Sequence, residues 1–199
     1  MLVVGCCGAG KSTVARELAD RLGLPLTHLD QEYWRPGWVR PEPDEWRARV
    51  AELIAEDAWI HDGNYDSTLE TRLARADTVV FVDTPRRRCL WRIAKRRILR
   101  NRADPLDDCA ERIDWEFVGY VWRFPADHRV RLLEKLNARA GRVDVVRLRT
   151  PSQIRGYLDG LKLLTSFSSV ASGLQVDASQ GGGASASRRR MRKHRQRRE

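Results

Sequence analysis

The sequence predicts an α/β fold in which short buried strands alternate with amphipathic helices. Short apolar runs alternate along the chain with segments whose apolar residues recur at helical spacing, and no internal repeat interrupts this order. A glycine-rich segment lies directly between the first apolar run and the first helical segment. The 199 residues, of which 42% are hydrophobic, suffice for one sizeable core but hardly for two. We therefore expect one main domain.

Five short apolar runs are the candidate strands. Several are rich in β-branched residues, which is typical of parallel strands that are buried on both faces. The candidate strands cover residues 2–4, 26–29, 58–61, 78–82 and 143–148. A strand in front of such a glycine-rich turn normally supplies about five residues, so the first strand is expected to be short.

Helices are expected between these strands. The segment 12–22 has apolar residues at spacings of four and stops at Gly23, and Pro43 opens a helix that runs through Ile54. Further helical periods cover residues 68–76, 86–100, 109–124, 128–139 and 152–164.

The net charge of +10 lies mostly at the C-terminus. Residues 188–199 hold eight Lys or Arg against Glu199 alone. The preceding segment, 166–187, is rich in serine, glycine and alanine, and it cannot bury enough apolar area to offset the entropy cost of ordering. We expect a folded domain over residues 1–165 and a disordered extension over 166–199.

Composition also argues against membrane, zinc and disulfide-framework proteins. No apolar run approaches the roughly 18 to 20 residues of a membrane span, so we expect a cytoplasmic protein without a membrane partner. The cysteines form no CxxC pair and no cluster with histidine, which favours reduced thiols. They are Cys6, Cys7, Cys89 and Cys109.

The segment GCCGAGKS at residues 5–12 has the spacing of a phosphate-binding loop, G-x-x-x-x-G-K-[ST]. Glycines let successive backbone N–H groups surround phosphates, Lys11 neutralises the outer phosphates, and Ser12 can ligate Mg²⁺. A tight turn with an accidental lysine is the alternative, which the strand and helix on either side disfavour. We expect ATP and Mg²⁺ as cofactors, with the nucleotide on Gly5, Gly8, Ala9, Gly10, Lys11, Ser12 and Thr13.

Two carboxylates at strand ends are expected to complete the site. Asp62 follows the run 58–61, where an acid can hold the water shell of Mg²⁺. Asp30 ends the run 26–29 and would act as general base or bind the acceptor, or else only shape a turn. Asp83 is a competing magnesium candidate that ranks behind Asp62, because Thr84 after it indicates the start of a helix.

Arginines recur at spacings of four along one side of the segment 86–100. They are Arg92, Arg96 and Arg100, and we expect catalytic roles for Arg96 and Arg100. Phosphoryl transfer moves charge onto the transferring oxygens, which arginines stabilise. A solvated basic stripe is an equally good interpretation. The polar segment 101–108 is expected to form the hinge or tip of a lid.

Taken together, these motifs resemble the adenylate-kinase-like group of P-loop kinases. The similar stretches are the loop itself, DGNY at 62–65, VVFVDTP at 79–85 and WRIAKRR at 91–97. LDQEYWRPGW, DGNYDSTL and CAERIDWEFVGYVWRFP further resemble bacterial proteins labelled DNA topology modulation proteins. The resemblance covers about residues 1–165 and leaves the tail unmatched.

The resemblance implies a three-layer P-loop NTPase fold with a five-stranded parallel sheet. It also implies an acceptor region over about 30–59 and a lid over about 96–109. It implies that Lys11 and Ser12 lie at the phosphates and Mg²⁺ and that Asp62 lies in the magnesium shell. Arg92 would lie by the nucleotide base and Arg96 at a phosphate.

The chain departs from adenylate kinases directly after Asp62 and Gly63. Those enzymes place an aromatic, a proline and an arginine there, and the arginine meets the acceptor's phosphate. Here Asn64, Tyr65 and Asp66 occupy these positions. An acidic residue at this place would repel a nucleoside monophosphate, which argues against AMP as the acceptor.

Aromatic side chains crowd the expected acceptor region. Tyr33, Trp34, Trp38 and Trp46 either form a wall for the acceptor or only pack a loop onto the core. A second group is expected to be mostly core. It comprises Trp115, Phe117, Tyr120, Trp122 and Phe124.

Two classes of function fit these patterns. The first is an ATP- and Mg²⁺-dependent phosphotransferase that acts on an unidentified small acceptor, with plain ATP hydrolysis as a variant. The second is a nucleic-acid-associated ATPase whose residues 188–199 make non-specific phosphate contacts. The sequence favours the enzyme, because the loop is specific for phosphate whereas arginine-rich ends are common.

Overall fold

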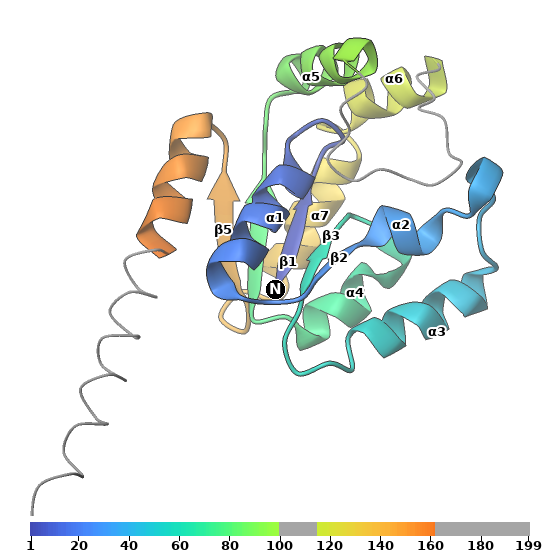
Figure 1. Cartoon of the computed structure of the whole chain (residues 1–199), viewed down its shortest axis with the longest axis vertical. Coiled ribbons are helices and arrows are strands. Elements are labelled where there is room, and N and C mark those ends of the chain that lie inside the picture. Colours follow the sequence, from blue (N-terminus) through green and yellow to red (C-terminus); the bar gives the residue numbers. More distant parts are fainter. Residues whose placement is uncertain (100–114, 162–199) are drawn as a thin grey trace, which may run out of the picture. The chain divides into compact units, whose positions relative to one another are not determined.

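A parallel sheet of five strands lies at the centre of the computed structural model, which describes residues 1–99 and 115–161 (Figure 1). The strand order is β2-β3-β1-β4-β5. The strands are β1 (Leu2–Gly5), β2 (Leu26–His28), β3 (Ile60–Asp62), β4 (Thr78–Val82) and β5 (Asp144–Leu148). The expected α/β class with a five-stranded parallel sheet is therefore confirmed.

Helices follow most of the strands, as the hydrophobic periods predicted. Gly10 and Gly23, both with left-handed backbone, cap the two ends of the first helix. The helices are α1 (Lys11–Leu22), α2 (Leu29–Tyr33), the 3₁₀ turn η1 (Pro36–Trp38), α3 (Pro43–Leu53), α4 (Asp66–Arg75), α5 (Arg86–Leu99), α6 (Trp115–Arg123) and α7 (His128–Asn137). A last described helical segment covers residues 151–161.

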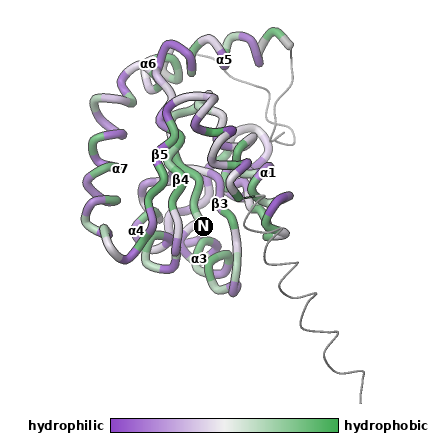
Figure 2. The backbone as a smooth tube through the Cα atoms, turned by 90° about the vertical axis from the view of Figure 1, so that its left-hand side faces the viewer, coloured by the Kyte–Doolittle hydropathy of each residue, from purple (hydrophilic) through white to green (hydrophobic). Residues whose placement is uncertain are grey.

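Two hydrophobic clusters hold the layers together, one on each face of the sheet. Leu2 and Val4 of β1 point into the cluster with α3, α4 and α7. Val3 points the other way, into the cluster with α1, α5, α6 and the segment 151–161. This alternation is the two-residue period of a strand buried on both faces. Figure 2 shows the hydrophobic stretches gathered on the strands and the hydrophilic ones on the outer helices.

The structure shifts some predicted boundaries. Strand β3 contains Asp62 instead of ending before it, because His28 and Asp62 still pair across β2 and β3. Strand β2 ends before Leu29, which begins α2, and neither α2 nor η1 was predicted. Such short helices are too brief to show a helical period.

Several predictions fall on residues that the structure does not describe. They include Arg100, most of the expected lid at 96–109, the start of the helix expected at 109–124, and the extension 166–199. The boundary at residue 165 thus stays a prediction. Within the described ranges, no helix combines the length and apolarity needed to cross a membrane.

One strand residue is unusual for a core. His61 of β3 is 0% exposed, and its ring stacks on Trp59 with centroids 4.2 Å apart. Neither ring nitrogen has a hydrogen-bond partner among the described residues. Burial, together with the positive charges of Arg72 and the N-terminus, lowers the pKa of His61 to about 3. The imidazole is therefore neutral at physiological pH.

Candidate functional site

The loop between β1 and α1 has a backbone that glycine alone adopts readily. Gly8 and Gly10 have φ angles of 75° and 100°. A Cβ atom at Gly8 would lie 2.6 Å from the carbonyl oxygen of Cys89 in α5, which is closer than atoms can approach. The glycines thus allow both the turn and its close packing on α5.

Lys11 lies at the first position of α1 and points back along the loop. Its Nζ donates a hydrogen bond to the carbonyl oxygen of Cys6 at 3.2 Å. Burial acts to lower the pKa of Lys11, but Cys7, Asp62 and Asp30 together raise it above its ordinary value. The ammonium is therefore charged, and both predicted carboxylates act on it.

The loop is held by α5 and by the residue Thr84 before that helix. Arg92 donates to the carbonyl oxygen of Ala9 at 2.6 Å, and the Thr84 hydroxyl donates to the same oxygen at 3.1 Å. Arg96 lies one turn further along α5 and is partly buried. On the other side, Ser12 is partly buried and Thr13 exposed in the first turn of α1.

Asp62 is buried at the carboxyl end of β3 and is held by its neighbour on β2. Its Oδ2 accepts a hydrogen bond from Nδ1 of His28 at 2.9 Å. Its Oδ1 is buried and has no hydrogen-bond partner among the described residues. A buried carboxylate oxygen without a partner is costly unless a cation or water completes it. The residues thus fit a magnesium shell at this point.

Asp30 lies in the first turn of α2, not at the end of a strand as the sequence suggested. The chain turns into helix directly after His28, which brings the Asp30 carboxylate within hydrogen-bonding distance of the Tyr65 hydroxyl. The Tyr65 hydroxyl donates to Oδ1 of Asp30 at 2.7 Å. Burial and the neighbouring Asp30 charge raise the pKa of Tyr65. Tyr65 thus stays a hydrogen-bond donor that orients Asp30.

Asn64 joins the segment after β3 to the glycine-rich loop after β1. Its side-chain oxygen accepts from the backbone N–H of Gly5 at 2.9 Å, and its amide donates to the Gly5 carbonyl oxygen at 2.8 Å. Tyr120 of α6 lies near enough to Asn64 for the two side chains to interact, and burial raises the pKa of Tyr120. Sequence reasoning gave neither residue a site role, although Asn64 stands where adenylate kinases differ.

Arg72 of α4 supports the loop that carries Asp62, Asn64 and Tyr65. Its side chain is 0% exposed and donates to the carbonyl oxygens of Gly63 at 3.1 Å, Tyr65 at 3.0 Å and Asn64. Burial lowers the pKa of Arg72 to about 10. Tyr65 is held at a φ of 37°, which is uncommon for residues other than glycine. Helical periodicity placed Arg72 in a helix but gave no sign of this role.

Asp83, the second magnesium candidate, is occupied by arginines. Its oxygens accept from Arg129 of α7 at 2.9 Å and from Arg147 of β5 at 2.8 Å. Burial acts to raise the pKa of Asp83, but these two hydrogen bonds lower it overall. Asp83 therefore ties α7 and β5 to the end of β4, which agrees with its lower rank.

Asp66, the acidic residue expected to repel an acceptor phosphate, forms an ion pair with a lysine. It opens α4, is exposed, and pairs with Lys135 of α7, whose Nζ lies 2.8 Å from Oδ1. The partner charge weakens the expected repulsion of an acceptor phosphate, so Asp66 alone is a poor guide to the acceptor.

The aromatic residues of the acceptor region mainly pack on one another. Trp46 is 3% exposed, and its ring contacts Tyr33 and Tyr65 with centroids 5.0 and 5.1 Å away. Trp34 and Trp38 contact each other edge to face and are partly buried. Trp46 therefore belongs to the core, and Tyr33 and Tyr65 pack against it on the side of Asp30.

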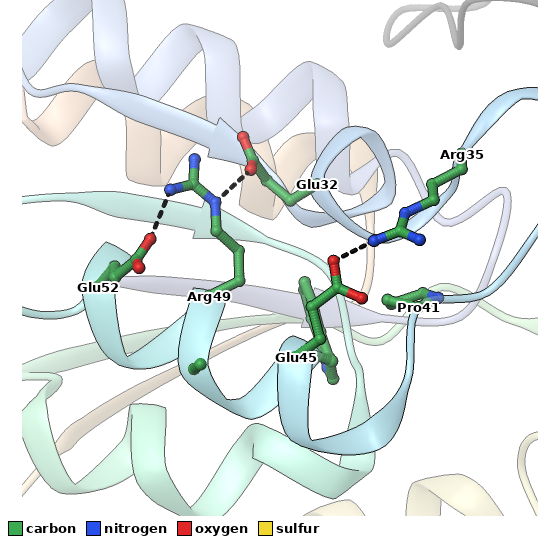
Figure 3. A pocket seen from close by; sticks show the side chains of 8 residues that line it. Glu32, Arg35, Pro41, Glu45, Arg49 and Glu52 are labelled. Atoms are coloured by element: carbon green, nitrogen blue, oxygen red, sulfur yellow. Dashed lines mark hydrogen bonds and ion pairs between the residues drawn. The ribbon is translucent and has the colours of Figure 1, made fainter.

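A pocket of about 320 Å³ lies between α2 and α3 (Figure 3). Two ion pairs join its sides: Arg49 of α3 pairs with Glu32 of α2 at 2.8 Å, and Arg35 pairs with Glu45 of α3. Arg49 also pairs with Glu52 within α3 at 2.9 Å. Its lining includes none of Lys11, Asp30 and Asp62. This pocket is therefore separate from the residues expected to carry the chemistry.

The prediction that the aromatics at residues 115–124 are mostly core holds for Phe117, Tyr120 and Phe124 but not for the two tryptophans. Trp115 is 90% and Trp122 48% exposed, whereas Phe124 is 3% exposed. Phe117 and Tyr120 lie on the same side as Phe124, at helical spacing, so the two tryptophans face outward. Trp122 packs beneath the guanidinium of Arg86, 4.0 Å from its ring centre.

Comparisons with known proteins give matches among solved structures. Similar structures include a gluconokinase from Sinorhizobium meliloti 1021 (18% identity, 89% of this chain and 95% of that chain, TM-score 0.46). A shikimate kinase from Bacteroides thetaiotaomicron (16%, 83% and 97%, TM-score 0.44) and a deoxyadenosine kinase from M. mycoides (16%, 82% and 98%, TM-score 0.46) are further examples.

These similarities are too distant to carry an activity over to this chain. No family model matches the sequence, and no curated protein matches it. The narrower resemblance to DNA topology modulation proteins therefore stays a prediction.

Proposed function

We propose that the chain is a phosphotransferase that binds ATP on the loop at residues 5–12 and transfers the γ-phosphoryl group to a small acceptor. One observation carries the proposal. Lys11, at the mouth of a left-handed glycine loop, experiences the charges of both Asp62 and Asp30. These charges support the proposal that Lys11 would bind phosphate while Asp62 would serve the metal and Asp30 the acceptor.

The chain's own residues divide the work between nucleotide and acceptor. Backbone N–H groups of the loop would surround the β- and γ-phosphates, and Lys11 would exchange the Cys6 carbonyl for phosphate oxygens. Arg92, fixed at Ala9, would lie beside the bound nucleotide. Arg96 would meet the charge that develops on the transferring group.

The residues that would hold Mg²⁺ are Ser12, through its hydroxyl, and Asp62, through water. Mg²⁺ supplies neutralisation of the charge on the β- and γ-phosphates. The partnerless, buried Oδ1 of Asp62 supports this assignment.

Asp30 is the general base in this proposal. Its carboxylate would take the proton of the acceptor hydroxyl while the acceptor oxygen attacks the γ-phosphorus. The bond from that phosphorus to the β–γ bridging oxygen breaks, and ADP leaves with the bonding electrons. Tyr65 donates to Oδ1 of Asp30, and this hydrogen bond holds the carboxylate in a fixed orientation.

The test is a screen of acceptors with γ-labelled ATP, run on the wild type, Asp30→Asn and the control Glu32→Gln. Glu32 lies two residues further along α2 but bonds Arg49 at 2.8 Å, away from Asp30. We expect a labelled acceptor with the wild type, a loss of about 100-fold or more in Asp30→Asn, and little change in Glu32→Gln. ATP hydrolysis without any labelled acceptor, equal in all three proteins, would contradict the transferase and favour a plain ATPase.

The nucleic-acid alternative depends on residues 188–199, which lie outside the described structure. No contact of the described residues favours it over the transferase.

A further inference from the structure

His28 is placed to control the orientation of the Asp62 carboxylate. The two residues face each other in the register of β2 and β3, at the carboxyl ends of both strands. The ring Nδ1 lies 2.9 Å from Oδ2 of Asp62. Both side chains are largely covered, with 11% of His28 and 4% of Asp62 exposed. The contact is thus fixed by strand pairing and shielded from water.

The contact leaves the two oxygens of Asp62 in different states. Because an ionised carboxylate only accepts hydrogen bonds, Nδ1 of His28 must carry the proton and donate to Oδ2. The other oxygen, Oδ1, is buried and lacks a partner among the described residues. A carboxylate turns about a soft torsion, so a fixed donor on one oxygen also fixes the direction of the other.

The charge of Asp62 also acts on the phosphate-binding loop. Asp62 is among the groups whose charge acts on the Lys11 ammonium at the phosphate-binding loop. The Asp62 carboxylate thus lies near enough to Lys11 for its charge to act at the phosphate-binding loop. Donors that hold metal-binding carboxylates in place commonly change metal affinity by about 10- to 100-fold when removed.

We infer that His28 is a positioning residue that aims Oδ1 of Asp62 at the water shell of nucleotide-bound Mg²⁺. This inference rests on the proposed function, since it concerns the same nucleotide site. The Nδ1 donor of His28 carries the role, and the shape of the ring does not.

The test measures how much Mg²⁺ strengthens nucleotide binding, without any turnover. The affinity for the non-hydrolysable analogue AMPPNP is measured by calorimetry in EDTA and in saturating Mg²⁺, and the ratio of the two affinities is compared between proteins. The variants are His28→Leu, which removes the donor, and His28→Asn, whose amide can occupy the Nδ1 position. Thr27→Val, one residue earlier in β2, is the matched control, and circular dichroism checks folding.

We expect His28→Leu to lower the ratio by about 10-fold, through weaker binding in Mg²⁺ and unchanged binding in EDTA. His28→Asn should restore the ratio to within about threefold of the wild type, and Thr27→Val should leave it unchanged. If His28→Leu does not fold, His28→Gln replaces it, because its longer amide reaches the Nε2 position and leaves Nδ1 unmatched.

Two results would overturn the inference. A ratio in His28→Leu equal to that of the wild type would show that the orientation of Asp62 does not depend on His28. An equal loss of affinity in EDTA and in Mg²⁺ would show that His28 only shapes the loop. If the wild type binds no AMPPNP in either condition, the proposed function fails together with the inference. If the wild type binds AMPPNP and only the His28 results disagree, the inference alone fails.

Discussion

The buried, neutral His61 should make the protein sensitive to mild acid. The imidazole has an ordinary pKa of 6.5 in the unfolded chain and a pKa of about 3 in the folded protein. Between these values the unfolded chain binds more protons than the folded one, so the free energy of unfolding falls as pH falls. The loss begins near the unfolded pKa and is complete only below the folded pKa.

The size of the effect follows from the distance below 6.5. At pH 5, which is about 1.5 units below the unfolded-state pKa, protonation of the imidazole stabilises the unfolded chain by about 1.4 kcal/mol per unit. His61 therefore lowers the free energy of unfolding by about 2 kcal/mol at this pH. His61→Leu lacks this titration, and the other titrating groups are common to both proteins. The difference in unfolding free energy between the two should therefore change by about 2 kcal/mol between pH 7.5 and pH 5, in favour of the variant.

Urea unfolding of wild type and His61→Leu at pH 7.5, 6 and 5 provides the measurement. Proton NMR of the ring in the folded wild type gives an independent check, since the imidazole should remain neutral at pH 5. A difference between the two proteins that is the same at every pH would refute the reasoning, and so would a ring that titrates near pH 6.5 in the folded state.

Three further predictions concern the site and the tail. Asp62→Asn should weaken Mg²⁺-dependent activity more than nucleotide binding itself, which parallel turnover and binding titrations would show; equal losses count against the metal role. Asn64→Ala should weaken AMPPNP binding by about 10-fold, since it removes two hydrogen bonds from Gly5. Unchanged binding by the folded variant would show that these hydrogen bonds do not contribute to nucleotide binding. Binding to unrelated DNA duplexes should be sequence-independent, steeply salt-sensitive and lost on deletion of residues 188–199; sequence-selective binding that survives the deletion would instead favour the nucleic-acid function.

The sequence predicted the sheet well because its strands are buried on both faces. A short continuous apolar run between two helical segments indicates a buried strand. The run Thr78–Val82 is such a case, and the structure has this strand with the expected ends. The left-handed turn at the glycines and the start of α1 at Lys11 were also predictable, since this spacing of glycines before a lysine indicates a turn between a strand and a helix.

Contacts that depend on the arrangement of distant elements were not predictable. Asn64 reaches Gly5 across 59 positions, and Asp66 meets Lys135 across 69. The arginine partners of Asp83 come from α7 and β5. Such pairs arise from the order of strands in the sheet, which residue types alone do not encode. The outward direction of Trp115 and Trp122 likewise follows from how α6 packs.

Binding of Mg²⁺ and AMPPNP to Lys11→Ala tests the central claim most directly. The matched control is Lys95→Ala on α5, whose Nζ lies 5.2 Å from the ring centre of the exposed Trp91. With folding verified, calorimetry should show one saturable site in the wild type and in Lys95→Ala, and an affinity about 100-fold lower in Lys11→Ala, because a charge-assisted contact to phosphate is lost. Equal affinity in Lys11→Ala and the wild type would contradict the assignment of the loop as the nucleotide site.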